Sequence, residues 1–161
     1  MSKRLPPALS DRLYAMLSGE HLNEHLYKAL LLITHDEKGW PYVAMLSFLE
    51  VIARDRENIR MAPFNNSTTS TNLRRDSKVT LILVDEELAC YIQASAQELE
   101  HDLKGFPGMA KVNLRIESIL EDKALDYEGS ARVSSGIRFE NPQMTEAYIA
   151  RGRAVLQALR Q

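Results

Sequence analysis

The sequence predicts a mainly β fold, a small six-stranded antiparallel barrel with helices at its two ends. Three observations predict this class. About six apolar or alternating segments of strand length are separated by turn signals. Two of them meet at a tight turn, Asp85-Glu86, as in a hairpin. Helical patterns lie mainly at the two ends of the chain, which argues against a doubly wound sheet.

Size and charge narrow the class of protein. The 161 residues fit one domain spanning 1–161, and 45% hydrophobic with 26% charged residues allows a real core. The net charge of −2 gives no support for general nucleic-acid binding. No apolar stretch reaches the ~18 residues that span a bilayer, and the N-terminus lacks a cleavage pattern. We therefore expect a soluble cytoplasmic protein with neither nucleic acid nor membrane as partner.

The first elements follow from local signals. Residues 1–9, which include two prolines, are expected to form a flexible tail. Ser10 is a predicted N-cap for a helix that runs to Leu17. A second helical segment is expected over residues 21–26, and the apolar run at 30–34 predicts a strand.

The middle of the chain reads mostly as strands. The apolar run over residues 41–53 predicts one long strand that could be buried on both faces. The other strands are expected at 58–63, 78–84, 88–96 and 110–120. Residues 68–74 could form one or two helical turns between them. Residues 132–139 read as a further strand or an extended loop, and Pro142 opens a C-terminal helix over 142–160. Its apolar spacing suits packing on the barrel or on a second subunit.

Residues 65–75, "NNSTTSTNLRR", concentrate five hydroxyl side chains in one place. Serine and threonine are good helix N-caps, so a polar turn that caps a helix explains them. Short donors at a helix N-terminus also suit an anion, most plausibly a phosphate. Both interpretations stay open on the residues alone.

A resemblance favours the phosphate. The ordered set "GWPYVAMLSFLEV", "NIRMAPFNNSTTSTNLRRDSKVTLILVDEE" and "LACYIQASA" resembles the pyridoxamine 5′-phosphate oxidase-like family of FMN-binding split barrels. "KVNLRIESILED" is similar to that family's late strand. The resemblance implies a six-stranded split barrel, a homodimer, and one FMN in each of two clefts at the subunit interface. It also implies an oxidoreductase, whose substrate the sequence does not identify.

The resemblance implies three groups of cofactor-binding residues. The residues along the isoalloxazine would be Ala44, Met45, Leu46 and Ser47. Met61 and Ala62 would flank the ribityl chain. The phosphate would be held by Ser67, Thr68, Thr69, Ser70, Thr71 and Asn72. Without the family, plain core packing is the simpler explanation for the methionines and Leu46.

The sequence departs from the family in the phosphate loop. Thr68 and Thr69 stand where tight FMN binders usually have Arg and Lys, and a hydroxyl cannot make the charge-assisted bonds of a cation. FMN affinity could then be low, or another cation such as Arg60 or Arg74 could serve. Alternatively, the protein is a non-catalytic split-barrel binding module that has lost or exchanged the flavin.

Other chemistry is less well supported. "HLNEH" has the His-x-x-Glu-His form of an inverted zinc-peptidase motif, with His21 and His25 on one helix face, but a third ligand is not evident. We find no constellation of Ser, Cys or His for catalysis, so no catalytic residue is predicted. The single cysteine, Cys90, excludes an intrachain disulfide and is expected to be a small buried residue.

Overall fold

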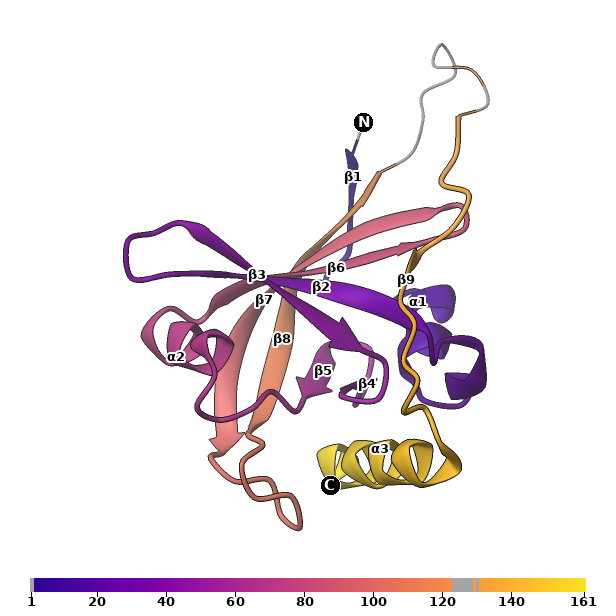
Figure 1. Ribbon diagram of the computed structural model, residues 1–161. Coiled ribbons are helices and arrows are strands. Elements are labelled where there is room, and N and C mark those ends of the chain that lie inside the picture. Colours follow the sequence, from indigo (N-terminus) through magenta and orange to yellow (C-terminus); the bar gives the residue numbers. More distant parts are fainter. Residues whose placement is uncertain (1, 123–128, 130) are drawn as a thin grey trace.

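The computed structural model describes residues 2–122, 129 and 131–161. These residues form one antiparallel sheet, strongly curled into a half-barrel, with three α-helices around it (Figure 1). The strands are β1 (Ser2–Leu5), β2 (Lys28–His35), β3 (Pro41–Ser47), β4 (Val51–Ala53), β5 (Asn58–Met61), β6 (Lys78–Asp85), β7 (Leu88–Glu100), β8 (Lys111–Asp122) and β9 (Ile137–Arg138). The helices are α1 (Asp11–Leu17), α2 (Thr68–Arg75) and α3 (Glu146–Arg160), with a 3₁₀ turn η1 (Leu22–Glu24). The predicted mainly β split barrel with helices at both ends is confirmed.

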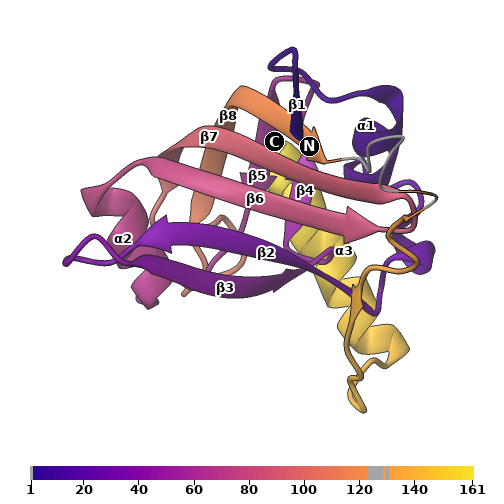
Figure 2. The ribbon, with the colours of Figure 1, turned by 90° about the horizontal axis from the view of Figure 1, so that it is seen from above.

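The order of the strands explains the open shape of the barrel. Neighbours run β3-β2-β6-β7-β8-β5-β4, while β1 adds to β8 and β9 adds to β2. The first and last strands of this path, β3 and β4, follow each other in the chain. Seen from above, β3, β2, β6 and β7 lie side by side, with α2 and α3 at different ends of the sheet (Figure 2).

Alternating side chains place the core inside this curl. On β2, Leu30 and Leu32 are fully buried, whereas Leu31 and Ile33 on the other face are partly exposed. A strand directs successive side chains to opposite faces, so this alternation separates an inner from an outer face. The inner face packs into a single apolar core with residues of all three helices.

The single long strand predicted over residues 41–53 is wrong. Two strands, β3 and β4, replace it, and residues 48–50 form a turn between them. Ser47 sets this turn, because its Oγ accepts from the N–H of Leu49 at 3.3 Å and its carbonyl accepts from the N–H of Glu50 at 3.3 Å. Within one chain the strand is not buried on both faces, since Val43 is 54% exposed.

Smaller differences occur at the ends of the chain. Part of the expected tail over residues 1–9 forms β1, which pairs with β8. Ser10 caps α1 as predicted, accepting a hydrogen bond from the N–H of Leu13. The helix expected over 21–26 is only the turn η1. The last helix begins at Glu146 rather than Pro142, because the Thr145 side chain caps it.

Helix α3 is fixed tightly to the barrel. A Cβ at Gly152 would lie 2.6 Å from Cδ2 of Leu49, so this glycine permits the close approach. At the C-terminal end of α3, the Leu159 carbonyl accepts a hydrogen bond from Nη1 of Arg60 at 2.7 Å, and Arg160 donates to the Ser18 carbonyl. Within the described residues, no helix has the length and apolar character that crossing a membrane requires.

Candidate functional site

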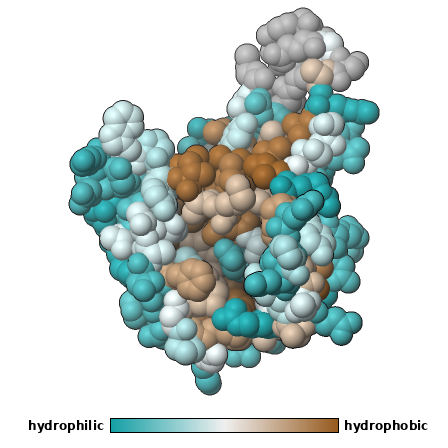
Figure 3. Space-filling view, in the orientation of Figure 1, coloured by the Kyte–Doolittle hydropathy of each residue, from teal (hydrophilic) through white to brown (hydrophobic). Residues whose placement is uncertain are grey.

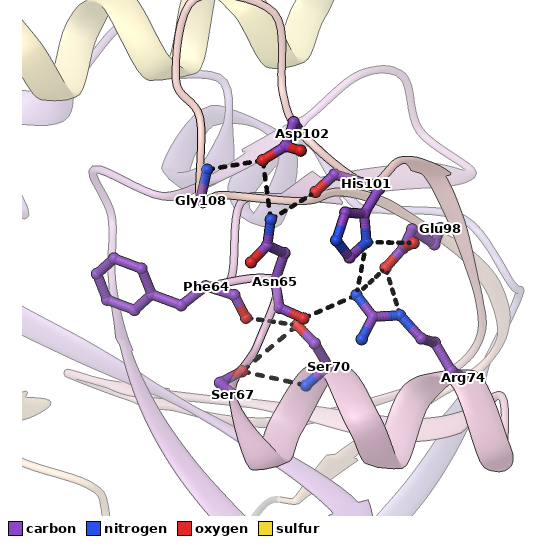
Figure 4. A network of polar contacts seen from close by, with 9 residues as sticks. All are labelled: Phe64, Asn65, Ser67, Ser70, Arg74, Glu98, His101, Asp102 and Gly108. Atoms are coloured by element: carbon purple, nitrogen blue, oxygen red, sulfur yellow. Dashed lines mark hydrogen bonds and ion pairs between the residues drawn. The ribbon is translucent and has the colours of Figure 1, made fainter.

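The hydroxyl-rich segment, residues 65–75, contains α2 and its N-cap. Ser67 is the N-cap, and its Oγ accepts from the N–H of Ser70 at 3.2 Å. The Oγ of Ser70 in turn donates to the Phe64 carbonyl at 2.7 Å, while the Phe64 ring points away from the network (Figure 4). The capping interpretation is therefore confirmed for the Ser67 hydroxyl, and the Ser70 hydroxyl is bonded within the same turn. It leaves less of the segment free for a ligand.

The remaining polar side chains of α2 divide by exposure. Asn72 is buried, and its Nδ2 donates to Oγ1 of Thr34 at 3.0 Å while its Oδ1 accepts from Arg75 at 3.0 Å. Thr69 is buried as well. Thr68 and Thr71 are exposed. Only these two hydroxyls of the helix reach the surface.

Arg74 has partners of its own. Its Nε donates to Oε2 of Glu98 at 2.8 Å, and its Nη2 donates to the Asn65 carbonyl at 2.8 Å, beside His101 (Figure 4). Burial alone would raise the pKa of Glu98, but the hydrogen bonds and positive charges of Arg74 and His101 together outweigh burial and lower that pKa. The side chain of Asn65 also bonds Asp102 at 2.9 Å. These contacts tie the start of α2 to the turn between β7 and β8.

The strand β5 and the residue after it supply the next predicted group. Met61 and Ala62 are buried in the core. Arg60 is buried at 8% exposure, with its guanidinium bonded to the Leu159 carbonyl of α3. Burial lowers the pKa of this guanidinium. Its contacts therefore direct Arg60 to α3.

The end of β3 borders a cavity of about 280 Å³. Met45 is 61% exposed, Leu46 is buried and Ser47 is half-buried. The structure brings these three predicted residues together, whereas Ala44 is half-buried and outside the lining. We call this space the Glu50 cavity, and its lining is Ala29, Met45, Leu46, Ser47, Leu49, Glu50, Phe139, Met144 and Tyr148.

Glu50 is the one charged residue of that lining, and sequence reasoning missed it. Burial raises the pKa of its carboxyl to about 7, although hydrogen bonding to Ser47 opposes the shift. The Oγ of Ser47 lies 3.4 Å from Oε2 of Glu50. No described basic side chain forms an ion pair with it. A signal was available, because Glu50 is the sole acid in the apolar run of residues 41–53.

No model of a known protein family matches the chain. The uncharacterized protein YclD of Bacillus subtilis (strain 168) is 33% identical over 152 residues, which cover 94% of this chain and 96% of YclD. The chain belongs to the YclD family.

Solved structures show the fold of this YclD-family member. A Lactobacillus delbrueckii protein described as a candidate pyridoxamine 5′-phosphate oxidase is 23% identical, covering 73% of this chain and 98% of its own, with a TM-score of 0.58. An FMN-binding protein of Syntrophomonas wolfei is 18% identical, covering 71% of this chain and 90% of its own, with a TM-score of 0.52. HutZ, the heme storage protein of Vibrio cholerae, is 16% identical, covering 68% of this chain and 94% of its own, with a TM-score of 0.50. The fold is the pyridoxamine 5′-phosphate oxidase-like split barrel.

In this member of the YclD family, the segment predicted as a possible zinc motif does not form the α-helix that the motif requires. The segment of His21 and His25 is a 3₁₀ turn rather than an α-helix, so the two side chains do not share a helix face. His25 stacks on Phe48 with ring centroids 4.8 Å apart, and burial lowers its pKa. No group of three potential metal ligands occurs among the described residues.

Cys90 is buried, as predicted. Burial raises the pKa of its thiol to about 12. Because the thiolate is the reactive form, a thiol with this pKa is inert near neutral pH. Cys90 is therefore a structural residue of the apolar core in this YclD relative.

Proposed function

We propose that this protein binds FMN and acts as an oxidoreductase of unassigned substrate. The isoalloxazine would lie against Ala44, Met45, Leu46 and Ser47 at the end of β3. The phosphate would lie at the N-terminus of α2, and the ribityl chain near Met61 and Ala62. Bound FMN would supply two-electron redox chemistry, while the chain would bind and orient both flavin and substrate.

The observation that carries this proposal is the cavity at the end of β3. Three of the four residues expected to contact the ring line it, and most of its lining is apolar. Apolar cavities with a few convergent polar groups are the usual form of cofactor and substrate sites. A flat, largely apolar ring along these three residues would border the cavity and leave its space to a substrate.

The phosphate end fits more weakly. The exposed hydroxyls of Thr68 and Thr71 and the first N–H groups of α2 offer neutral donors. The two cations of α2 are engaged, Arg74 with Glu98 and Arg75 with the His35 carbonyl. We therefore expect weak FMN binding, in which Arg74 contributes only if it leaves Glu98.

We propose further that a second copy of the chain completes the site. The outer faces of β2, β3 and β6 carry a patch that we call the outer apolar face, made of Leu31, Ile33, Val43, Met45 and Ile82. Val43 and Met45 are 54% and 61% exposed. Figure 3 shows apolar surface near the centre of the molecule, with hydrophilic surface to its left and right. Exposed apolar patches of this kind mark protein–protein interfaces.

A flavin titration tests the proposal. Purified protein should quench the fluorescence of added FMN saturably, and Thr68→Arg should tighten binding about tenfold by adding a charge-assisted bond. Thr71→Arg adds the same charge one turn further along α2 and should have a smaller effect. Protein that ignores FMN in all three forms would refute the proposal. Reduction assays with both nicotinamide cofactors would follow a positive result.

Light scattering on the same samples tests the dimer. Val43→Lys places a charge in the outer apolar face and should yield monomers, whereas Gln97→Lys, at an exposed position of β7, should leave a dimer. A wild-type monomer at micromolar concentration would contradict the second-copy proposal.

The alternative function is a non-catalytic binding module that has lost or exchanged the flavin. The ion pair between Arg74 and Glu98 favours it, because it removes a cation from the phosphate end. One structural neighbour with this fold is a heme storage protein, which makes heme the first other ligand to titrate. Saturable heme binding by protein that ignores FMN would support this alternative.

A further inference from the structure

The Glu50 cavity has an unusual combination of groups. One carboxyl, two aromatic rings and two thioethers face a space of about 280 Å³, which accommodates a small molecule. The rings belong to Phe139 and Tyr148, and the thioethers to Met45 and Met144.

The carboxyl lacks a cationic partner within the described chain. Its hydrogen bond from Ser47 is long, at 3.4 Å, and no described Lys or Arg pairs with it. A carboxylate in largely apolar surroundings is costly unless a positive charge approaches it. That cost is visible in the raised pKa of Glu50, about 7. A bound cation would remove the cost.

The aromatic rings favour the same ligand. The face of Tyr or Phe attracts ammonium groups, and cages of such rings recognise alkylated ammonium ions. An anion would find no described basic side chain in the lining, and a metal ion would find one carboxylate where it needs several ligands. The lining therefore selects an organic cation over the other charged classes.

We propose that the Glu50 cavity binds a compact organic ammonium group, with Glu50 as its ion-pair partner and Phe139 and Tyr148 as its aromatic contacts. The assignment of this cavity as a substrate pocket beside a flavin rests on the proposed function. The inference adds the substrate class, a molecule that presents an alkylammonium to the end of β3.

Choline and 3,3-dimethyl-1-butanol form a matched pair of probes, because a carbon replaces the charged nitrogen in the second. We expect the full-length protein at about pH 8 to bind choline roughly tenfold tighter than the alcohol in ligand-observed NMR titrations. The charge of choline does not depend on pH. A loss of this preference toward about pH 5 would therefore report protonation of Glu50, the one carboxyl of the lining.

Two variants locate the effect. Glu50→Gln should abolish the preference for choline while leaving the weak binding of the alcohol. Glu140→Gln removes one negative charge from an exposed residue next to Phe139, outside the lining, and should keep the preference. Tyr148→Leu should reduce it severalfold, and Tyr148→Phe, which keeps the ring, should retain most of it.

The outcomes separate this inference from the flavin assignment. Equal binding of the two probes, binding of neither, or a preference that survives Glu50→Gln would overturn the ammonium pocket. FMN binding without any choline preference overturns the pocket alone. A choline preference in protein that does not bind FMN would support the ammonium pocket and contradict the proposed FMN binding.

Discussion

The two ends of the proposed flavin site are built in opposite ways. At the hydroxyl-rich segment, the polar groups of Ser67, Ser70 and Asn72 already have partners inside the protein. At the Glu50 cavity, a carboxyl lies in apolar surroundings without a cation. The first end therefore stabilises the fold and has few groups left for a ligand. The second end destabilises the fold on its own, so a bound ligand would stabilise the protein most at this end.

Gly152→Val should have the largest effect on this contrast. The glycine lets α3 lie against Leu49, where even a Cβ would approach to 2.6 Å, and α3 forms one wall of the Glu50 cavity. Overpacking there should lower the free energy of unfolding by about 3 kcal/mol in urea titrations. Ala154→Val, on the exposed side of the same helix, is the control and should cost less than about 1 kcal/mol. Equal losses in both variants would contradict the close packing.

Glu50→Gln should be stabilising, in a pH-dependent way. The pKa of the carboxyl is 4.5 in the unfolded chain and about 7 in the folded protein. Between these values the folded state holds a proton that the unfolded state has released, so folding stability falls as pH rises through this window. We expect the variant to exceed the wild type by on the order of 2 kcal/mol at about pH 8, with little difference below about pH 4. Thermal unfolding at several pH values measures this, and a difference independent of pH would contradict it.

Asn72→Ala tests the end where the polar groups are already paired. The change removes hydrogen bonds to Thr34 and Arg75 and leaves the buried Thr34 hydroxyl without this partner. The loss should be about 1.5 kcal/mol in the free energy of unfolding. Thr71→Ala, at the exposed neighbouring position, should change it by less than about 0.5 kcal/mol. A neutral Asn72→Ala would mean that this side chain is available to a ligand.

Ser67→Ala should have the smallest effect. It removes the N-cap of α2 and should cost about 1 kcal/mol. Thr68→Ala is the matched control, because that exposed hydroxyl does not cap the helix. If the two substitutions cost the same in chemical denaturation, the cap is not the role of Ser67.

Much of the fold followed from local sequence signals. Apolar or β-rich runs and turn residues located β2, β6 and β7, alternation located β8, and the cluster of Ser and Thr located α2. The break between β3 and β4 was missed because residues 48–50 include Phe48 and Leu49, which look like strand residues, and neither Gly nor Pro. β1 was missed because its charged residues carry no strand pattern, and it forms only by pairing with β8.

The candidate site was less accessible to sequence reasoning. Residues 45–47 were found through the resemblance, but the cavity beside them also needs Phe139, Met144 and Tyr148, from far along the chain. Likewise, whether Arg74 of α2 is available depends on Glu98, which lies on β7. Spacing along the chain does not reveal such long-range partners.

The order of the strands has a consequence for how the chain folds. The short hairpin of β4 and β5 joins the rest of the sheet through β8, which follows β6 and β7 in the chain. During synthesis on the ribosome, this hairpin must therefore wait for its pairing partner to emerge. Folding dominated by such non-local pairing takes milliseconds to seconds in small domains. We expect β6 and β7 to associate first, and the gap between β3 and β4 to take its final shape last.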